Sequence, residues 1–270
     1  MSMKNRTAGV LIGILAVVCL GLIFSAVYPL TTSDPHAATP PGDRFTVSDT
    51  DSYTASGRLV VDGQVRLAFE GFVTSDGVWY QKVVDDDVVS EAYQPTANET
   101  VYHRLSIEGS DEAKQRRELI TEDEGRELVR EGRNGERATF IVEENGTGVT
   151  QPVSGTASVF VNSLFLAGYE AKRRDSSAVT VYEPQSGWYD GLETYHITGA
   201  SGTVRADTDT HVVKSADVTW DVTAPAGTYA EYVLVASLTD EPTSYRISFE
   251  FDQSGSDPQR PTWVGETDST

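Results

Sequence analysis

The chain has 270 residues, of which 41 are acidic and 21 are basic, so its formal net charge at pH 7 is -20. Nucleic-acid binding through phosphates needs a basic face, so this charge balance excludes a nucleic-acid-binding protein of that kind. The single cysteine, Cys19, excludes an intramolecular disulfide framework, and the fold must therefore rest on its apolar core.

The chain begins with a long apolar segment. Residues 8–30 carry no charged side chain, and Lys4 and Arg6 precede them. A helix of about 20 apolar residues crosses the hydrocarbon core of a bilayer, and positive charges before it keep that end in the cytoplasm. We expect a cytoplasmic N-terminus (1–7), one transmembrane helix (8–30) and an extracytoplasmic C-terminal domain at the cell membrane.

Two alternatives to this anchor stay open. A cleaved signal peptide would end at small residues, and residues 25–27 and 36–38 are tolerable cleavage contexts. Lipidation would use Cys19, although apolar residues continue after it. All three interpretations leave the domain outside the cytoplasm.

The acidic composition also predicts the solvent in which the domain works. Only five of the basic residues are lysine. Repulsion among surface carboxylates is screened in molar salt, where the Debye length is about 3 Å. This acid-rich, lysine-poor usage resembles that of proteins from extreme halophiles, so we expect a halophilic protein. An acidic secreted protein from a mesophile is the alternative.

Composition divides the remainder into three parts. Residues 31–43 contain three prolines and small polar residues, which predicts an extended linker. Residues 44–252 are long enough to form one domain with a large core. Residues 253–270 are poor in apolar side chains, which predicts a disordered acidic tail in which Trp263 is an isolated aromatic residue.

The first half of the domain alternates apolar and polar residues, the pattern of strands with one buried face. We expect strands at 53–61 and 65–73, joined by a tight turn at Asp62-Gly63. A strand at 78–84 follows, and after a polar loop a further strand at 101–107. These elements predict an antiparallel meander.

The middle of the chain has a different pattern. Residues 111–132 are mostly charged, so any helix there is largely exposed. A short strand is expected at 139–143. Residues 154–174 have helical spacing, and Lys172, Arg173 and Arg174 would lie at the helix C-terminus, where the helix dipole favours cations.

Strand patterns return in the second half. They are expected at 178–183, 192–198, 202–206, 211–222, 228–237 and 243–252, with a turn at 207–210. The predicted fold class is α+β: an N-terminal transmembrane helix plus a large curved antiparallel sheet, a half-barrel, with one or two helices packed on one face.

This layout resembles a known family. Residues 202–220 read as a strand, an acidic turn and a returning strand, and residues 245–251 as a closing strand. The chain is similar to the extracytoplasmic half-barrel superfamily of the periplasmic lipoprotein carrier and the periplasmic sigma-factor regulator (LolA/RseB-like), and to membrane-anchored haloarchaeal proteins. The resemblance implies that the concave face holds an acyl chain, a lipid-modified segment or another apolar ligand.

Residues with catalytic or metal-binding chemistry are few. His103, His196 and His211 are spread over separate expected strands, and no nucleophile motif accompanies them. We therefore expect no enzyme, no catalytic residue, no cofactor and no metal site. The acidic turns at 85–87 and 207–209 are interpreted as solvated turns rather than calcium sites. Asn98 and Asn145 lie in acceptor motifs for N-glycosylation.

Two functional hypotheses follow. In the first, the domain is a membrane-anchored binding module for an apolar or lipid-like ligand or a lipidated partner. In the second, it is a structural or interaction protein of the cell envelope with a solid core and no ligand. The candidate ligand-lining residues, which could instead fill the core, are Phe69, Trp79, Phe160, Leu164, Trp220 and Phe249.

Overall fold

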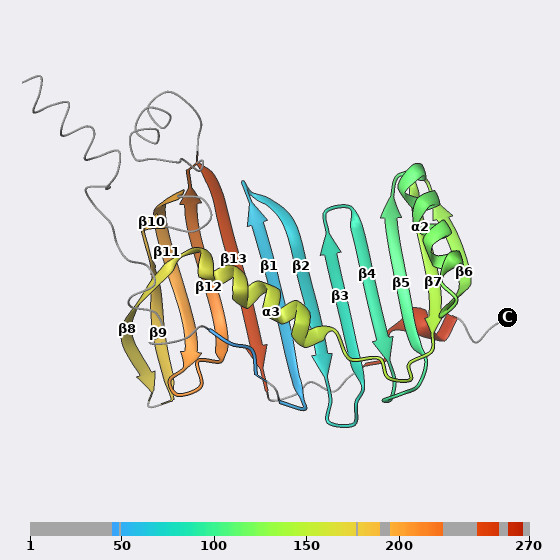
Figure 1. Cartoon of the computed structure of the whole chain (residues 1–270), viewed down its shortest axis with the longest axis horizontal. Helices are drawn as coiled ribbons and strands as arrows, with labels where there is room; N and C mark the ends of the chain where they lie inside the picture. Colours follow the sequence, from blue (N-terminus) through green and yellow to red (C-terminus); the bar gives the residue numbers. More distant parts are fainter. Residues whose placement is uncertain are drawn as a thin grey trace, which may run out of the picture.

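The domain is built around a single large sheet. The computed structural model describes residues 45–48, 50–176, 178–189, 195–223, 242–253 and 259–266. These residues form a 13-stranded sheet whose strands pair antiparallel, with two helices, as the sequence predicts in outline (Figure 1).

Some expected elements fall outside this part of the chain. The apolar segment 8–30, the linker 31–43 and the expected strand at 228–237 lie outside the described residues. Within the described residues, no helix is long and apolar enough to cross a membrane.

The strand order across the sheet is β6-β7-β5-β4-β3-β2-β1-β13-β12-β11-β9-β8, and β10 pairs with β11. The elements are β1 Tyr53–Val61, β2 Gln64–Val73, β3 Trp79–Asp85, β4 Val88–Gln94, β5 Val101–Glu108, α2 Ser110–Glu122, β6 Arg126–Asn134, β7 Arg137–Glu144, α3 Val153–Ser163, η1 Leu164–Leu166, β8 Gly168–Ser176, β9 Val179–Gln185, β10 Gly187–Tyr189, β11 Tyr195–Asp207, β12 Val213–Val222, β13 Thr243–Asp252 and η2 Thr262–Glu266.

The centre of the sheet joins the two ends of the domain. β1 pairs along its length with β13, so that Gly57 lies opposite Phe249. β2, β3, β4, β5, β7 and β6 extend the sheet to one side, and β12, β11, β9 and β8 extend it to the other. The central pairing therefore closes a loop of nearly the whole domain, a non-local contact that has a high entropic cost during folding.

Several local predictions are confirmed. The expected strands at 53–61, 65–73, 78–84, 101–107, 139–143 and 243–252 correspond to β1, β2, β3, β5, β7 and β13. Asp62 and Gly63 have φ values of 50° and 78° and form the tight turn between β1 and β2.

The helix expected at 154–174 is wrong in its second half. α3 ends at Ser163, a 3-10 turn follows, and β8 begins at Gly168. Tyr169 is only 1% exposed because it packs into the core from β8. Lys172 therefore lies on a strand, where its Nζ contacts the carboxylate of Glu170, two residues earlier on the same side.

Besides β8, three strands were not predicted. β4 occupies the expected polar loop, and its polar residues conceal the alternation of Val88 and Ala92 on one face. β6 is an edge strand whose residues are almost all exposed, so its sequence lacks an apolar face. β10 is only three residues long. The separately expected strands at 192–198 and 202–206 are parts of one longer strand, β11.

Both helices lie on the same face of the sheet (Figure 1). Val142, which packs beneath α2, belongs to one row of paired residues that runs through His103, Ala92 and Gln81 to Gly71 beneath α3. Side chains of one such row point to the same side. We call this side the helix face and the opposite side the open face.

α3 is amphipathic along its whole length. Its buried residues recur at helical spacing: Val153, Ala157, Phe160 and Val161, followed by Leu164 after the helix ends. They pack on β1, β2, β13 and β3, whereas Val159 on the other side of the helix is 51% exposed. α2 packs on β5, β6 and β7 through Ala113 and Ile120.

The start of the described domain is fixed beside the beginning of β12. Thr46 forms a parallel bridge with Val212. The Phe45 ring, 2% exposed, packs edge-to-face against Tyr169 and Tyr182, with centroid distances of 5.2 and 5.3 Å. The first described residues are therefore well packed against the sheet.

The contact between Gly57 and Phe160 yields a prediction on stability. A Cβ atom at Gly57 would lie 2.7 Å from the Phe160 ring, so Gly57→Ala must shift this ring or the helix that carries it. We expect Gly57→Ala to lower the free energy of unfolding by about 1–3 kcal/mol, measured by urea denaturation in high salt.

Gly155→Ala is the matched control. A Cβ atom there meets no atom within 4 Å, and Gly155 lies inside α3. Alanine is the better helix former, so this change should raise the free energy of unfolding by up to about 1 kcal/mol. Equal effects of the two substitutions would contradict the described packing of α3.

Candidate functional site on the open face of the sheet

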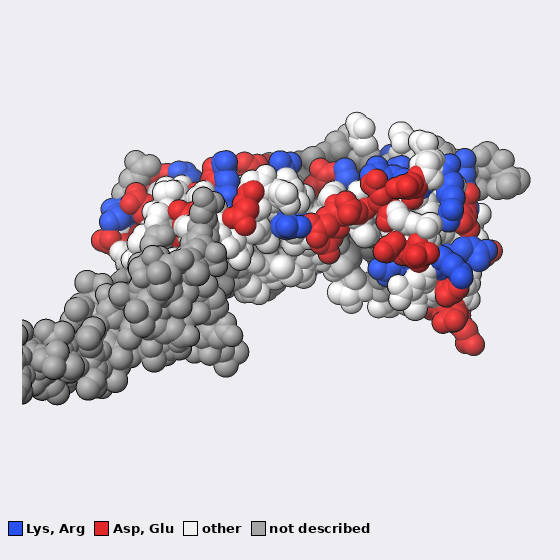
Figure 2. Space-filling model, turned by 90° about the horizontal axis from the view of Figure 1, so that it is seen from above, with Lys and Arg blue, Asp and Glu red and all other residues white. Residues whose placement is uncertain are grey.

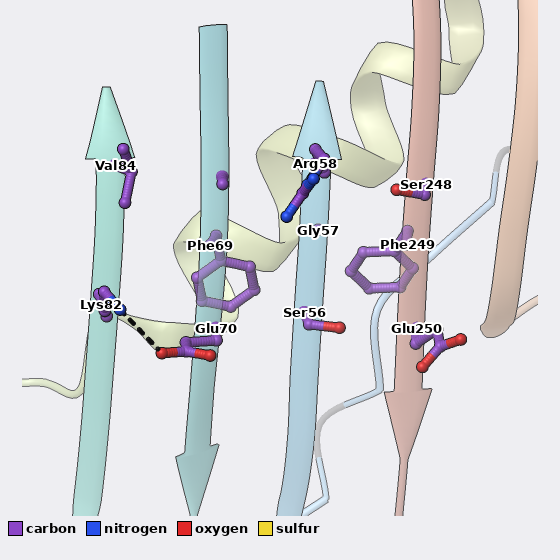
Figure 3. Close-up of a pocket in the computed structure, with 11 residues that line it drawn as sticks. Ser56, Gly57, Arg58, Phe69, Glu70, Lys82, Val84, Ser248, Phe249 and Glu250 are labelled. Carbon is purple, nitrogen blue, oxygen red and sulfur yellow. Dashed lines mark ion pairs between the residues drawn. The ribbon is translucent and has the colours of Figure 1, made fainter. Parts of the chain in front are cut away.

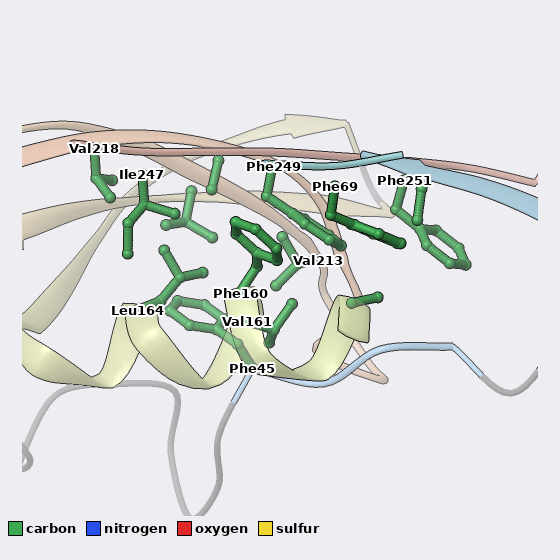
Figure 4. Close-up of a cluster of buried hydrophobic side chains, with 14 of the residues drawn as sticks. Phe45, Phe69, Phe160, Val161, Leu164, Val213, Val218, Ile247, Phe249 and Phe251 are labelled. Carbon is green, nitrogen blue, oxygen red and sulfur yellow. The ribbon is translucent and has the colours of Figure 1, made fainter. Parts of the chain in front are cut away.

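The expected ligand-lining residues are placed in the core beneath α3. Figure 4 shows Phe160 reaching from the helix towards Phe69 and Phe249 on the strands, and Leu164 reaching towards Ile247. The Phe69 and Phe160 rings stack with centroids 5.9 Å apart. All the expected side chains are at most 4% exposed: Phe69, Trp79, Phe160, Leu164, Trp220 and Phe249.

These side chains share one apolar cluster with α3, so the helix occupies the face on which an apolar ligand was expected. On the helix face, the members of this cluster that lie on strands are therefore covered by α3. The opposite side of the same strands carries exposed side chains, among them Arg58, Glu70 and Glu250.

A row of charged and polar side chains crosses the open face at right angles to the strands. We call it the charged row; backbone pairing aligns its members side by side. In order across the sheet it consists of Glu250 on β13, Ser56 on β1, Glu70 on β2, Lys82 on β3, Glu91 on β4 and Arg104 on β5.

Neighbours in the charged row form ion pairs. Lys82 Nζ lies 3.4 Å from Glu70 Oε1, and both side chains are partly exposed. Arg104 Nη1 lies 3.3 Å from Glu91 Oε2, and the Glu91 side chain is only 13% exposed. An exposed ion pair contributes little stability. We therefore interpret the exposed half of the row as a surface that presents charges at defined positions, rather than as a source of stability.

A cavity of about 350 Å³ lies over the first half of the charged row. Figure 3 shows Arg58, Lys82 and Glu250 around it, with α3 on the far side of the strands. Arg58 and Glu250 are exposed, and Ser56 forms part of the cavity wall. This cavity offers cationic, anionic and hydroxyl groups, a set suited to hydrogen bonding with a polar partner.

A second row on the open face is aromatic. Backbone pairing aligns Phe72 on β2, Tyr80 on β3, Tyr93 on β4 and Tyr102 on β5, and we call these residues the aromatic row. The Phe72 and Tyr80 rings lie 5.8 Å apart. Tyr80 Oη donates a hydrogen bond to Glu91 Oε1 at 2.9 Å, which links the two rows.

Burial and the adjacent Glu91 carboxylate raise the pKa of the Tyr80 hydroxyl, and burial raises that of Tyr93. Both groups therefore keep their protons at neutral pH. Tyr80 can act as a permanent hydrogen-bond donor to Glu91, and the aromatic row adds no charge to the face.

Residues 259–266 lie against the aromatic row, and we call them the C-terminal strap. Trp263 is 5% exposed and Val264 is fully buried, and both cluster with Tyr93. This part of the chain differs from the disordered tail that its composition predicts, because the sheet supplies an aromatic surface for Trp263. The composition of a short segment carries no signal of such a distant partner.

The histidines lie in unrelated places. His103 Nε2 is 3.1 Å from Glu144 Oε2 on the helix face, and Arg126 Nε is 3.0 Å from the same oxygen. His211 is in the turn before β12, separated from β5 in the sheet order by β4, β3, β2, β1 and β13. The side chain of His196, on β11, is outside the described part.

The acidic turns serve as strand connections. Asp207 Oδ1 accepts hydrogen bonds from the backbone N–H groups of Asp209 and Thr210 and from the Thr210 hydroxyl. These bonds hold the pKa of Asp207 below its usual range. Asp86 has a φ of 46° between β3 and β4, and its carboxylate lies 3.0 Å from Arg66.

The expected glycosylation sites lie in two neighbouring exposed loops. Asn145 Oδ1 accepts a hydrogen bond from Thr147 N at 3.0 Å. Asn98 has a φ of 66°, and its Oδ1 accepts one from Gly148 N at 3.4 Å. Buried Gln94 joins the loops by donating to Glu99 O and Gly146 O. Both asparagines remain candidates for modification.

Comparison with known proteins gave no match to a family model, to a curated protein or to a solved structure.

His103 yields a prediction on pH dependence. Burial lowers its pKa, opposed by Glu144 and assisted by Arg126. In the unfolded chain its pKa returns to about 6.5, so below that pH the unfolded chain binds more protons and stability falls as pH falls. We expect the free energy of unfolding to drop more between pH 7.5 and 5.5 in the wild type than in His103→Gln.

The comparison requires urea denaturation of both chains in the same high-salt buffers. All the carboxylates are common to the two chains, so the difference between their pH slopes isolates His103. Identical slopes, or a steeper loss of stability in His103→Gln, would contradict the buried, neutral histidine.

Proposed function

We propose that the protein is a membrane-anchored extracytoplasmic interaction module of the cell envelope, which binds a protein partner through the open face of its sheet. The observation that supports this proposal most directly is the difference between the two faces of the sheet, one buried and apolar and the other exposed and charged. The expected ligand-lining side chains pack against α3, whereas Arg58, Glu70 and Glu250 are exposed on the opposite side.

The chemistry of the open face favours a polypeptide partner. The charged row offers both signs of charge together with hydroxyl groups, and the aromatic row supplies flat apolar surface beside it. Seen from above, a view onto the ends of the strands rather than onto the open face, Lys and Arg side chains are interspersed with Asp and Glu (Figure 2). In molar salt, charges act only over about 3 Å, so binding would depend on matched contacts rather than on net attraction.

The location is part of the same proposal. The uncharged segment 8–30, preceded by Lys4 and Arg6, supports a single-pass anchor with the domain outside the cytoplasm. The linker 31–43 would join the anchor to the domain at Phe45. The low lysine content supports a high-salt exterior.

A second candidate function is the binding of an apolar or lipid-like ligand, as in the half-barrel family. It is favoured by the general layout, a large antiparallel sheet with α3 lying across one face. In this alternative the sheet would curve around a ligand, and α3 would have to move away from Phe69 and Phe249 to admit it.

Photo-crosslinking in membranes tests the proposed interaction. The full chain would carry a photoreactive amino acid at Arg58 on the open face or at Val159, which is 51% exposed on the outer side of α3. We expect covalent adducts with another polypeptide from position 58 and none from position 159. Adducts from position 159 alone would overturn the proposal.

A further inference from the structure

The C-terminal strap occupies the aromatic row in the manner of a bound peptide. Trp263 and Val264 form a cluster with Tyr93, and Val78, Tyr80 and Tyr102 pack around them. Figure 1 shows η2, in red, near the lower end of β5, although it is far along the chain from Tyr93 and Tyr102, with which it clusters. A tryptophan that fills an aromatic surface is a typical anchor of protein–protein recognition.

The strap holds its own turn. Val264 N donates a hydrogen bond to Pro261 O at 3.1 Å, and Arg260 Nη2 donates one to Val264 O at 3.4 Å. These bonds shape residues 260–264 into a compact unit that presents Trp263 to the sheet. This short sequence (a basic residue, proline, any residue, tryptophan and an aliphatic residue) therefore contains both side chains that cluster with Tyr93.

The fit of the strap is incomplete in one respect. Trp263 Nε1 is buried, yet within the described residues it has no hydrogen-bond partner. A buried donor without an acceptor opposes burial of its side chain. A segment of this size, held by few side chains, also opens more readily than the sheet beneath it. A peptide that supplied an acceptor to the indole could replace the strap.

Space for a larger ligand lies beside the strap. A cavity of about 800 Å³ is bounded on one side by the strap residues Gln259 to Trp263 and on the other by strands β1, β2, β3, β4, β5 and β13. Its acidic wall includes Glu250 and Asp252, and its floor includes Phe72. The acidic wall favours a basic side chain at the end of the ligand that lies towards β13.

We propose that the aromatic row and this cavity form a peptide-binding site that the chain's own C-terminal strap occupies when no partner is present. The partner is a polypeptide segment with a tryptophan, an aliphatic residue directly after it and a basic residue before it. Its binding displaces the strap. This inference rests on the proposed function, because it identifies one ligand of the same open face.

The test uses the full chain in detergent and high salt, and a fluorescent peptide with the sequence of residues 259–266. In Trp263→Ala the strap loses its anchor, so the site is free. In the wild type the tethered strap competes at an effective concentration in the millimolar range. We expect saturable binding to Trp263→Ala and at least about tenfold weaker binding to the wild type.

Two control peptides define the recognition. The peptide in which alanine replaces the tryptophan should not bind Trp263→Ala, and the peptide in which glutamate replaces the arginine should bind it more weakly. If Trp263→Ala does not fold, judged by thermal denaturation, Trp263→Phe keeps part of the apolar contact but weakens the strap, and the peptide should then bind Trp263→Phe more tightly than it binds the wild type.

Three results would overturn the inference. The first is equal binding of the peptide to the wild type and to Trp263→Ala, and the second is no binding to a folded Trp263 variant. The third is a wild-type dimer that disappears in Trp263→Ala, because it would assign the site to the strap of a second copy. None of these results affects the crosslinks expected at position 58, so failure of the peptide site is distinguishable from failure of the proposed function.

Discussion

The packing of Phe160 on Gly57 holds α3 over the centre of the sheet, where β1 pairs with β13. The absence of a side chain at Gly57 lets the phenylalanine ring approach the backbone, and Phe69 stacks on the ring from β2. Because β1 and β13 come from opposite ends of the domain, one helix covers the junction that closes the fold. The rest of the sheet extends outwards from this covered centre.

This arrangement gives the two faces of the same strands different roles. Residues that point towards α3 are mostly apolar and buried, and those that point away include the charged row and the aromatic row. The strap covers part of the aromatic row, so the chain shields its most apolar open surface with its own C-terminal residues. A protein with a net charge of -20 can thereby keep aromatic side chains on the open face without exposing all of them to solvent.

The sequence predicts the strands that alternate cleanly, such as β1 and β13, because one of their faces is buried by α3. It does not predict β4 or β6, because polar residues occupy both faces of these strands. The sequence predicts a helix that continues to residue 174, beyond the end of α3. Residues 168–174 fit a helix and a strand equally well until their pairing with β9 is known. The alternation identifies the aromatic residues of the core. It does not show whether a helix of the chain or a ligand covers them. The charged row depends on the alignment of separate strands, including β4, and Trp263 contacts strands more than 150 residues earlier.

The most direct test of the account is whether the helix face is solid. The full chain would be purified in high salt and extracted with organic solvent, and the extract would be analysed for lipid by mass spectrometry. The account predicts no lipid in stoichiometric amount, because Phe69, Phe160 and Phe249 pack against one another beneath α3. One lipid bound per chain would contradict this prediction and favour the lipid-binding function.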